Sequence, residues 1–343
     1  MGKTERSVKL GIGHLCTAVA VVLAAAAPAR ADDVADFYRG RTLSLIAGFN
    51  VGGGADAYAR LIARHLGAHL PGNPTVVVKN MQGAGSALAA NHVFTASPRD
   101  GSEIGLFAGN MAVDPVIGGA AAKFDARSFN WIGAPASETN VCLASRASAF
   151  KTIDDTFKAE MVTGTGTYDF PVVLNNVLGT RLKLVKGYAG SAALRLAMER
   201  GEIDGFCGVT LDSMRTAGLT ESKANYLLQI GLKKDPALGA IPFVMDYASR
   251  EEDRQILRLI FGWLDLERPL AAPPATPPER VAALRRAFDA AMADPALLAE
   301  AAQASLSIAP MRGAAIARFV EEVYQTPPSV AARAAQLLGR ESK

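Results

Sequence analysis

The sequence has few of the residues on which metal binding and covalent catalysis usually depend. Its 343 residues include three cysteines and four histidines. The cysteines lack the C-x-x-C spacing of a zinc site, and no segment has the Walker A pattern with its lysine. Neither Ser86 nor Ser191 lies in a G-x-S-x-G sequence. Residues 164–169 begin like a dinucleotide-binding fingerprint, but Asp169 replaces the third glycine. We therefore expect no cofactor and no enzymatic activity.

The histidines offer a weak alternative. His65 and His69 are four residues apart, a spacing that can place two metal ligands on one face of a helix, and His92 could join them. No acidic residue completes a known metal-binding pattern around them. We interpret the histidines as polar helix positions and expect no metal site.

Apolar runs long enough to span a bilayer are also missing. Lys3, Arg6 and Lys9 precede the apolar run 17–27, which is too short for a stable membrane anchor. Ala29-Arg30-Ala31 fits a small-residue cleavage site. We interpret residues 1–31 as a signal peptide cleaved near Ala31, and we expect a periplasmic protein.

Excess charge disappears with that segment. The whole chain has a formal net charge of +3, whereas the part that follows Ala31 contains 32 basic and 32 acidic residues. A neutral chain gives no electrostatic support for nucleic-acid binding. We expect no nucleic-acid partner and a monomer.

Two cysteines, Cys142 and Cys207, follow the predicted signal peptide. An even number of cysteines in an oxidising compartment favours a disulfide. The alternative is a pair of buried small apolar residues, because cysteine is often fully buried without a partner. The sequence leaves both interpretations open.

Strand-like and helix-like runs alternate through most of the chain, which predicts an α/β fold with parallel strands. Residues 43–49 are expected to form a strand and residues 56–70 a helix, and the pattern repeats up to the helical C-terminal part. We predict two lobes joined by at least two crossovers, with a ligand cleft between them. The first lobe is expected to comprise residues 32–140 and 226–343, and the second residues 141–225.

Two glycine-rich turns are the most informative segments that are present. Each lies between a predicted strand and a predicted helix: Gly52-Gly53-Gly54-Ala55-Asp56 and Gln82-Gly83-Ala84-Gly85-Ser86. Glycine lets backbone N–H groups approach a ligand closely, and the start of a helix adds free N–H groups and a positive dipole. The pair therefore predicts a cradle for an anion.

Polar residues near these turns have competing interpretations. We expect Asp56 to cap the N–H groups of the following helix, and a compatible second role is to fix the glycine turn or a bound water at the ligand. Asn110 and Asp114 follow the third predicted strand and are candidates for the cleft. In the second lobe, the turns around Gly164 and Gly190 should also lie at the carboxyl ends of strands, where α/β sheets bind ligands.

The order and spacing of several motifs resemble the Bug family of periplasmic solute receptors, which serve tripartite tricarboxylate transporters. The resemblance covers essentially the whole chain after Ala31. It rests on segments 51–60, 78–86, 98–101, 187–190, 201–205 and 272–281. The chain departs from the family pattern at Asn50-Val51, Ala55, Met81-Gln82 and Ser86.

This resemblance implies a two-lobed periplasmic binding protein that captures a small carboxylate for membrane subunits of a transporter. It implies that the first-lobe turns hold the carboxylate through backbone N–H groups and ordered water, while second-lobe turns choose the rest of the ligand. The expected ligand-binding residues are Asn50, Gly52, Gly53, Gly54, Asp56, Gln82, Gly83, Ala84, Gly85, Ser86, Asn110, Thr165, Gly166, Thr167, Tyr188, Gly190 and Ser191. Two other interpretations remain open, an exported enzyme on a similar scaffold and a ligand-sensing subunit of a signalling system.

Overall fold

The computed structural model describes residues 29–165, 170–188, 191–216 and 218–340, together with Gly2. Almost all of the predicted signal peptide lies outside these residues, as do Gly166, Thr167 and Gly190 of the predicted site. The described chain begins with helix α1 (Ala29–Tyr38). Within the described part, no helix combines the length and the apolar character that a membrane span needs.

The first lobe is built on a six-stranded sheet with the strand order β11-β4-β10-β3-β1-β2. Strand β1 runs parallel to both of its neighbours, whereas β10 runs antiparallel to β3 and β4. The strand bounds are β1 Thr42–Ala47, β2 Thr75–Asn80, β3 Glu103–Leu106, β4 Asn130–Ala134, β10 Leu270–Ala272 and β11 Met311–Arg312.

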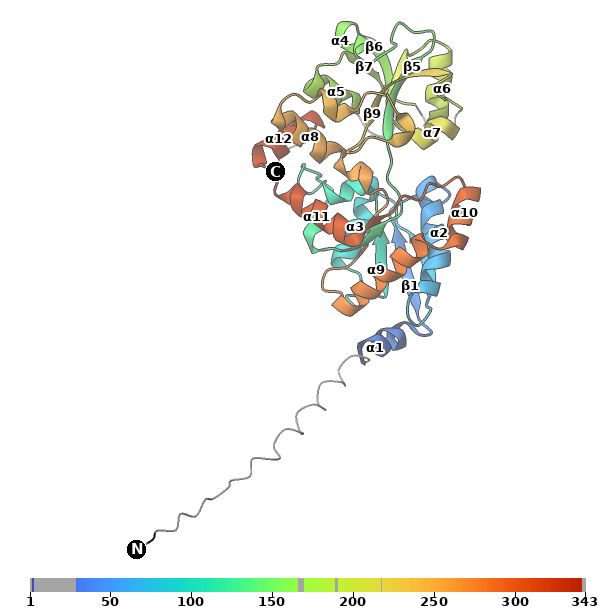
Figure 1. The fold of residues 1–343 in the computed structure, drawn as a ribbon, viewed down its shortest axis with the longest axis vertical. Coiled ribbons are helices and arrows are strands. Elements are labelled where there is room, and N and C mark those ends of the chain that lie inside the picture. Colours follow the sequence, from blue (N-terminus) through green and yellow to red (C-terminus); the bar gives the residue numbers. More distant parts are fainter. Residues whose placement is uncertain (1, 3–28, 166–169, 189–190, 217, 341–343) are drawn as a thin grey trace.

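Helices cover both faces of this sheet (Figure 1). Leu43 and Leu45 of β1 belong to the apolar core that includes helix α2, whereas Ile46 belongs to the core that includes helix α3. Alternate residues of a strand point to opposite faces, so β1 is apolar on both sides because both are buried. The helices are α2 Gly54–His69, α9 Pro278–Met292 and α10 Pro295–Gln303 on one side, and α3 Ala87–Thr95 and α11 Gly313–Tyr324 on the other.

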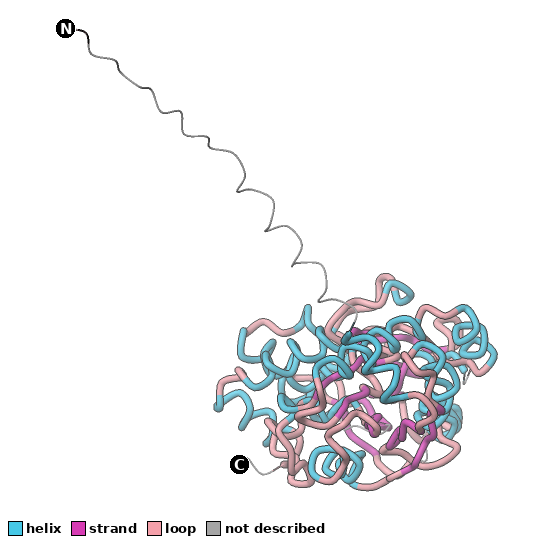
Figure 2. Tube along the Cα trace, turned by 90° about the horizontal axis from the view of Figure 1, so that it is seen from below, coloured by secondary structure: helices cyan, strands magenta, loops and turns pink. Residues whose placement is uncertain are grey.

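The second lobe contains a five-stranded sheet with the order β7-β6-β8-β5-β9. Strands β6, β7 and β8 are parallel, and β5 is antiparallel to both of its neighbours. The elements are β5 Asn140–Ser145, α4 Asp155–Lys158, β6 Met161–Thr165, α5 Phe170–Leu178, β7 Leu182–Val185, α6 Ser191–Glu199, β8 Gly205–Thr210, α7 Leu211–Thr216 and β9 Ala224–Ile230. Figure 2 shows the strands lying inside a layer of helices.

Strand β9 corrects the boundary that was expected near residue 226. The sequence predicts that residues from 226 onward belong to the first lobe, but β9 pairs with β5 along its length. Every residue of β9 is buried, Asn225 and Gln229 included, and the residues of a buried strand do not indicate which sheet holds it. The chain stays beside this sheet after β9, since Phe243 pairs with Gln229 and the ring of Tyr247 stacks on Phe157.

The lobes are linked at three places. Residues 135–139 lead from β4 to β5, and residues 262–269 lead from α8 (Glu251–Phe261) to β10. The third link is C-terminal, because α12 (Pro328–Leu337) packs against α8 while the Nη1 of Arg340 binds the Oδ1 of Asp114 at 2.7 Å. Burial raises the pKa of Asp114, and Arg340 opposes that effect. The two-lobed α/β fold predicted from the sequence is thus confirmed.

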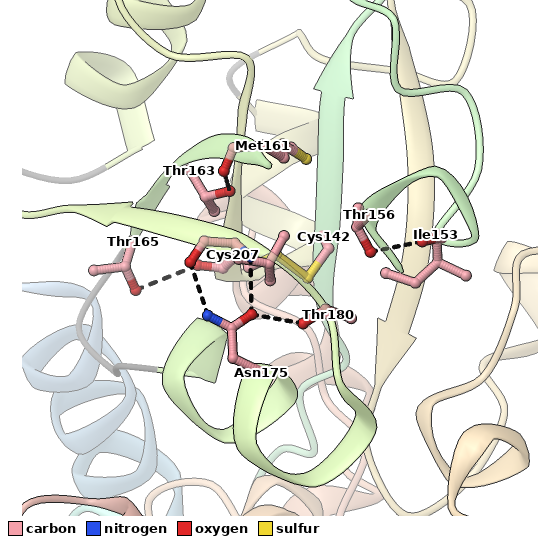
Figure 3. The surroundings of a disulfide bond; sticks show 10 residues. Cys142, Ile153, Thr156, Met161, Thr163, Thr165, Asn175, Thr180 and Cys207 are labelled. Atoms are coloured by element: carbon pink, nitrogen blue, oxygen red, sulfur yellow. Dashed lines mark hydrogen bonds between the residues drawn. A yellow bond between two sulfur atoms is a disulfide. The ribbon is translucent and has the colours of Figure 1, made fainter. Parts of the chain in front are cut away.

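A disulfide joins Cys142 of β5 to Cys207 of β8 (Figure 3). The two residues face each other on neighbouring strands, and both side chains are buried. The carbonyl oxygen of Cys207 accepts a hydrogen bond of 3.5 Å from the hydroxyl of Thr165, the last residue of β6. The disulfide therefore lies close to the end of β6, the strand that precedes the predicted turn around Gly164.

We predict that removing this disulfide lowers stability substantially. The cysteines are 65 residues apart in sequence. Closing a loop of that length lowers the entropy of the unfolded chain, which adds about 4 kcal/mol to the free energy of unfolding. The double variant Cys142→Ala/Cys207→Ala should therefore lose about 2 to 4 kcal/mol in denaturant unfolding. Mass spectrometry of unreduced protein supplies the control, since two free thiols in folded, exported protein would contradict the prediction.

Candidate ligand-binding site

The topology brings the carboxyl ends of two sets of strands to facing edges. Strand β4 is parallel to β3, so residues 135–139 leave the first sheet at the edge where β1, β2 and β3 end. They enter the second sheet at Asn140, which pairs with Thr210, the last residue of β8. Loops at the carboxyl ends of both sheets consequently lie on either side of the crossovers, where open α/β sheets bind their ligands.

The first glycine turn connects β1 to α2 and is exposed. Gly52 has a φ of +82°, a conformation that favours glycine, and helix α2 begins at Gly54. Among the described residues, the N–H groups of Gly53, Gly54 and Ala55 donate no well-formed hydrogen bond, although residues 51–52 form a turn that brings the Asn50 carbonyl towards the N–H of Gly53. A β-carbon at Gly52 or Gly54 would meet nothing within 4 Å. The start of α2 thus presents unpaired N–H groups to open space.

Asp56 holds this turn in place from inside. Its Oδ2 accepts hydrogen bonds from the N–H of Gly52 at 2.9 Å and the Nε of Arg60 at 2.8 Å, and its Oδ1 accepts one from the Nδ2 of Asn80 at 2.8 Å. The same Nδ2 also donates to the carbonyl oxygen of Phe49 at 3.1 Å. The predicted cap is wrong, because Asp56 lies inside α2 and the helix start has no side-chain cap; the carboxylate binds Gly52 before the helix and so fixes the glycine turn.

The carboxyl of Asp56 is strongly acidic in this setting. Burial by itself raises its pKa, but the hydrogen bonds from Arg60, Gly52 and Asn80, together with the charge of Arg60, outweigh burial and lower the pKa to about 2. Asp56 therefore stays ionised at neutral pH. A carboxylate with three donors and such a pKa is suited to holding structure and poorly suited to accepting a proton.

The second glycine turn follows β2 and has an unusual backbone. The φ angles of Gly83, Ala84, Gly85 and Ser86 are +146°, +46°, +61° and +85°, although residues other than glycine rarely adopt positive φ. Gly83, Ala84 and Gly85 are exposed, and their N–H groups have no acceptor among the described residues. Strained backbone of this kind is concentrated at functional sites.

Ser86 is a structural link between strand ends, which differs from the ligand contact predicted for it. Its side chain is 2% exposed. Its Oγ donates to the carbonyl oxygen of Gly48 at 3.1 Å and accepts from the N–H of Ala108 at 3.1 Å. A β-carbon at Gly48 would lie 1.9 Å from that oxygen, so position 48 must be glycine. The hydroxyl joins the loops that follow β1, β2 and β3.

The remaining first-lobe candidates are divided between the open surface and internal networks. Asn50 and Gln82 are exposed beside the two turns. Asn110 lies in the short 3-10 helix Gly109–Ala112 and donates its Nδ2 to Asp114 at 2.8 Å, which connects it to the Arg340 ion pair. Its amide nitrogen is therefore engaged inside the protein.

The described second-lobe candidates lie at the facing edge. Thr165 is buried at the end of β6, and Ser191 is half-buried at the first position of α6. Tyr188 is half-buried against the core that includes Val141 and Leu194. Gly166, Thr167 and Gly190 lie outside the described residues.

The histidines have acidic partners that the sequence did not reveal. The Nε2 of His65 lies 2.8 Å from Glu300, and the Nε2 of His69 lies 2.9 Å from Asp294. These contacts join α2 to α10. In the described part of the chain, no three His, Cys, Asp or Glu side chains are arranged to hold a metal ion.

A charged cluster joins the first two crossovers and was not predicted from the sequence. The Nη2 of Arg268 binds the Oε1 of Glu138 at 2.7 Å, and the guanidinium lies 4.5 Å from the centre of the Tyr58 ring. Burial, followed by repulsion from Glu138, raises the pKa of Glu267 to about 8 against the opposing effect of Arg268. The cluster connects the hinge to helix α2. No local motif marks it, because its members come from distant segments.

Three cavities lie away from the glycine turns. One of about 650 Å³ lies at the hinge beside Glu138 and Met311, one of about 540 Å³ lies between α2 and β2, and one of about 250 Å³ lies between α8 and α11. None of the three is lined by residues 50–56 or 82–86. Unpaired donors identify anion chemistry and an empty volume does not, so the exposed turns are the stronger candidate for a ligand site.

Comparisons with solved structures agree with this architecture, although no family model and no curated protein matches the chain. A TctC solute-binding protein from Polaromonas superposes with a TM-score of 0.68 at 19% identity, over 88% of this chain and 99% of that one. The periplasmic binding protein BugD gives 0.60 at 20% identity over 88% and 99%. Rpa4515 of R. palustris, solved with adipate, gives 0.61 at 18% identity over 87% and 98%. The chain thus has the two-lobed fold of periplasmic binding proteins.

We predict that Ser86→Ala weakens the fold measurably. The substitution leaves the Gly48 carbonyl and the Ala108 N–H without their shared partner, and an unsatisfied buried polar group costs about 1 to 3 kcal/mol. Chemical unfolding should show a loss in this range. Ser86→Gly separates the loss of the hydrogen bonds from backbone strain, because glycine tolerates the positive φ at this position but lacks the hydroxyl. Equal stability of the wild type and the alanine variant would contradict the role given to Ser86.

We also predict a pH dependence from Asp56. The pKa of its carboxyl is lower in the folded state than its ordinary value of 3.8, so its contribution to stability is complete above that value and is lost as the pH falls towards 2. Asp56→Asn should be less stable than the wild type at pH 6, and the difference in unfolding free energy should shrink between pH 4 and pH 2. A constant difference across this range would show that ionisation of Asp56 does not matter.

Proposed function

We propose that this protein is an exported, periplasmic solute receptor that captures a small carboxylate between its two lobes. It acts as a monomer and passes its ligand to the membrane subunits of a tripartite tricarboxylate-type transporter, without performing catalysis. The observation that carries this proposal is the pair of exposed turns with unpaired N–H groups at the facing edge of the first sheet. The solved neighbours, one of them with adipate, support the same choice.

The carboxylate is held mainly by backbone. One oxygen accepts hydrogen bonds at the start of α2, from the N–H groups of Gly53, Gly54 and Ala55, where the helix dipole adds a partial positive charge. The other oxygen accepts hydrogen bonds from the N–H groups of residues 83–85. Both turns are already fixed, by Asp56 and by Ser86, so little conformational entropy is lost when the ligand binds.

The second lobe contributes to selection of the remainder of the ligand. Thr165, Tyr188 and Ser191 lie at its facing edge. Rotation about residues 135–139 and 262–269 brings this edge onto the bound anion, which is the hinge closure typical of two-lobed receptors. A general base in an enzyme usually has a pKa near neutrality. The pKa of Asp56, beside the cradle, is far below that range, so Asp56 is not suited to this role.

Filling the cradle with a side chain should weaken binding strongly and leave the fold intact. Gly53 has a φ of −81°, and a β-carbon there would meet only the Asn50 carbonyl oxygen at 3.8 Å. Gly53→Val is therefore sterically tolerated, but its methyl groups occupy the space in front of the free N–H groups. We expect affinity to fall at least tenfold in calorimetry with whichever straight-chain mono- or dicarboxylate binds the wild type, adipate included.

Ala299→Val is the matched control, because Ala299 is exposed on α10, away from both turns. It should bind like the wild type. Two results would overturn the proposal: wild-type protein that binds none of these acids, and a folded Gly53→Val variant that binds with unchanged affinity.

A further inference from the structure

The surface around the two turns points to the kind of carboxylate that fits them. We propose that Val51 and Leu88 select ligands in which the carboxylate is followed by an apolar carbon chain, in preference to polar tricarboxylates. This inference rests on the proposed function of the same site. It assigns Val51 and Leu88 as residues that determine specificity.

These two side chains are the most exposed large apolar groups in the described part of the chain. Val51 is 70% exposed and Leu88 51% exposed, whereas the three others of this class, Val77, Leu196 and Leu298, are each 41% exposed. Isolated apolar residues on a surface need no explanation. Here, however, the two highest values belong to the residue directly before the first turn and to a residue of α3 two positions after the second.

Each apolar side chain adjoins free donors. Val51 immediately precedes Gly52, where the backbone reverses with positive φ before the start of α2. Leu88 borders the second turn, since its Cδ2 would lie 3.2 Å from a β-carbon at Gly83. A carboxylate bound to the N–H groups would therefore place the carbons next to it within reach of Val51 and Leu88.

The charges beside the turns also fit one carboxylate better than several. Arg60 is the only lysine or arginine within residues 48–60 and 81–96. Its Nε binds Asp56 at 2.8 Å, and its Nη2 lies 3.3 Å from the Oδ1 of Asn80. Its charge is balanced within the turn, so at the two turns themselves an anion is attracted mainly through backbone dipoles, while the guanidinium of Arg268 lies further along α2, over Tyr58 and paired with Glu138. A helix start carries about half a positive charge, which is insufficient for the several charges of a citrate-like ligand.

The test is a chain-length series of unbranched monocarboxylates from acetate to octanoate, with citrate for comparison, measured by calorimetry. Burying a methylene group against an apolar surface strengthens binding up to about fourfold. We expect wild-type affinity to rise with each methylene and to exceed the affinity for citrate. The double variant Val51→Ser/Leu88→Ser should bind acetate within about twofold of the wild type but lose most of the gain per methylene.

Leu298→Ser is the matched control, because Leu298 is an exposed leucine on α10, away from both turns. It should keep the wild-type slope, and thermal unfolding should verify that all variants are folded. The inference fails while the receptor function stands if wild-type protein binds carboxylates but prefers citrate, or if the double variant keeps the slope. It also fails if the double variant weakens every ligand by the same factor, because the side chains would then act in lobe closure. Wild-type protein that binds no carboxylate would overturn the proposed function itself.

Discussion

The hydroxyl of Ser86 is the interaction on which the site depends. It joins the carbonyl oxygen that follows β1 to the N–H group that follows β3, while belonging to the turn that follows β2. Three parallel strands therefore end at fixed positions relative to one another. Free N–H groups bind an anion well only if they point to one place before the ligand arrives, because ordering them during binding would consume the binding free energy.

This arrangement has a local conformational cost. Ala84 and Ser86 both have positive φ, which costs roughly 1 kcal/mol or more for a residue with a β-carbon. The hydrogen bonds of Ser86 and the packing of α3 beneath the turn offset that cost. The first turn is built differently, because glycine supplies the positive φ at position 52 and the ionised carboxylate of Asp56 supplies the anchor. Both turns reach the same result, exposed donors on a rigid support.

Defined side-chain contacts also hold the links between the lobes. Arg268 and Glu138 join the two central crossovers, and the contact of Arg268 with Tyr58 connects them to α2, the helix that begins at the first turn. Arg340 ties the C-terminal segment to Asp114, next to Asn110. These packed and charged contacts thus join the segments that connect the lobes to helix α2 and to the loop that follows β3.

The sequence alone predicted the two-lobed α/β fold, the two glycine turns and the pairing of Cys142 with Cys207 as one of two possibilities. These features depend on local composition and on the order of elements, which a sequence records directly. It could not assign β9 to its sheet, because the residues of a strand carry no record of the strand beside it. It also could not distinguish the roles of two consecutive residues. Gly85 is exposed, whereas Ser86 is buried and binds the N–H of Ala108. Only the tertiary structure decided such roles, since hydrogen bonds between Ser86, Gly48 and Ala108, or between Arg268 and Glu138, join residues whose distance in space is fixed by packing.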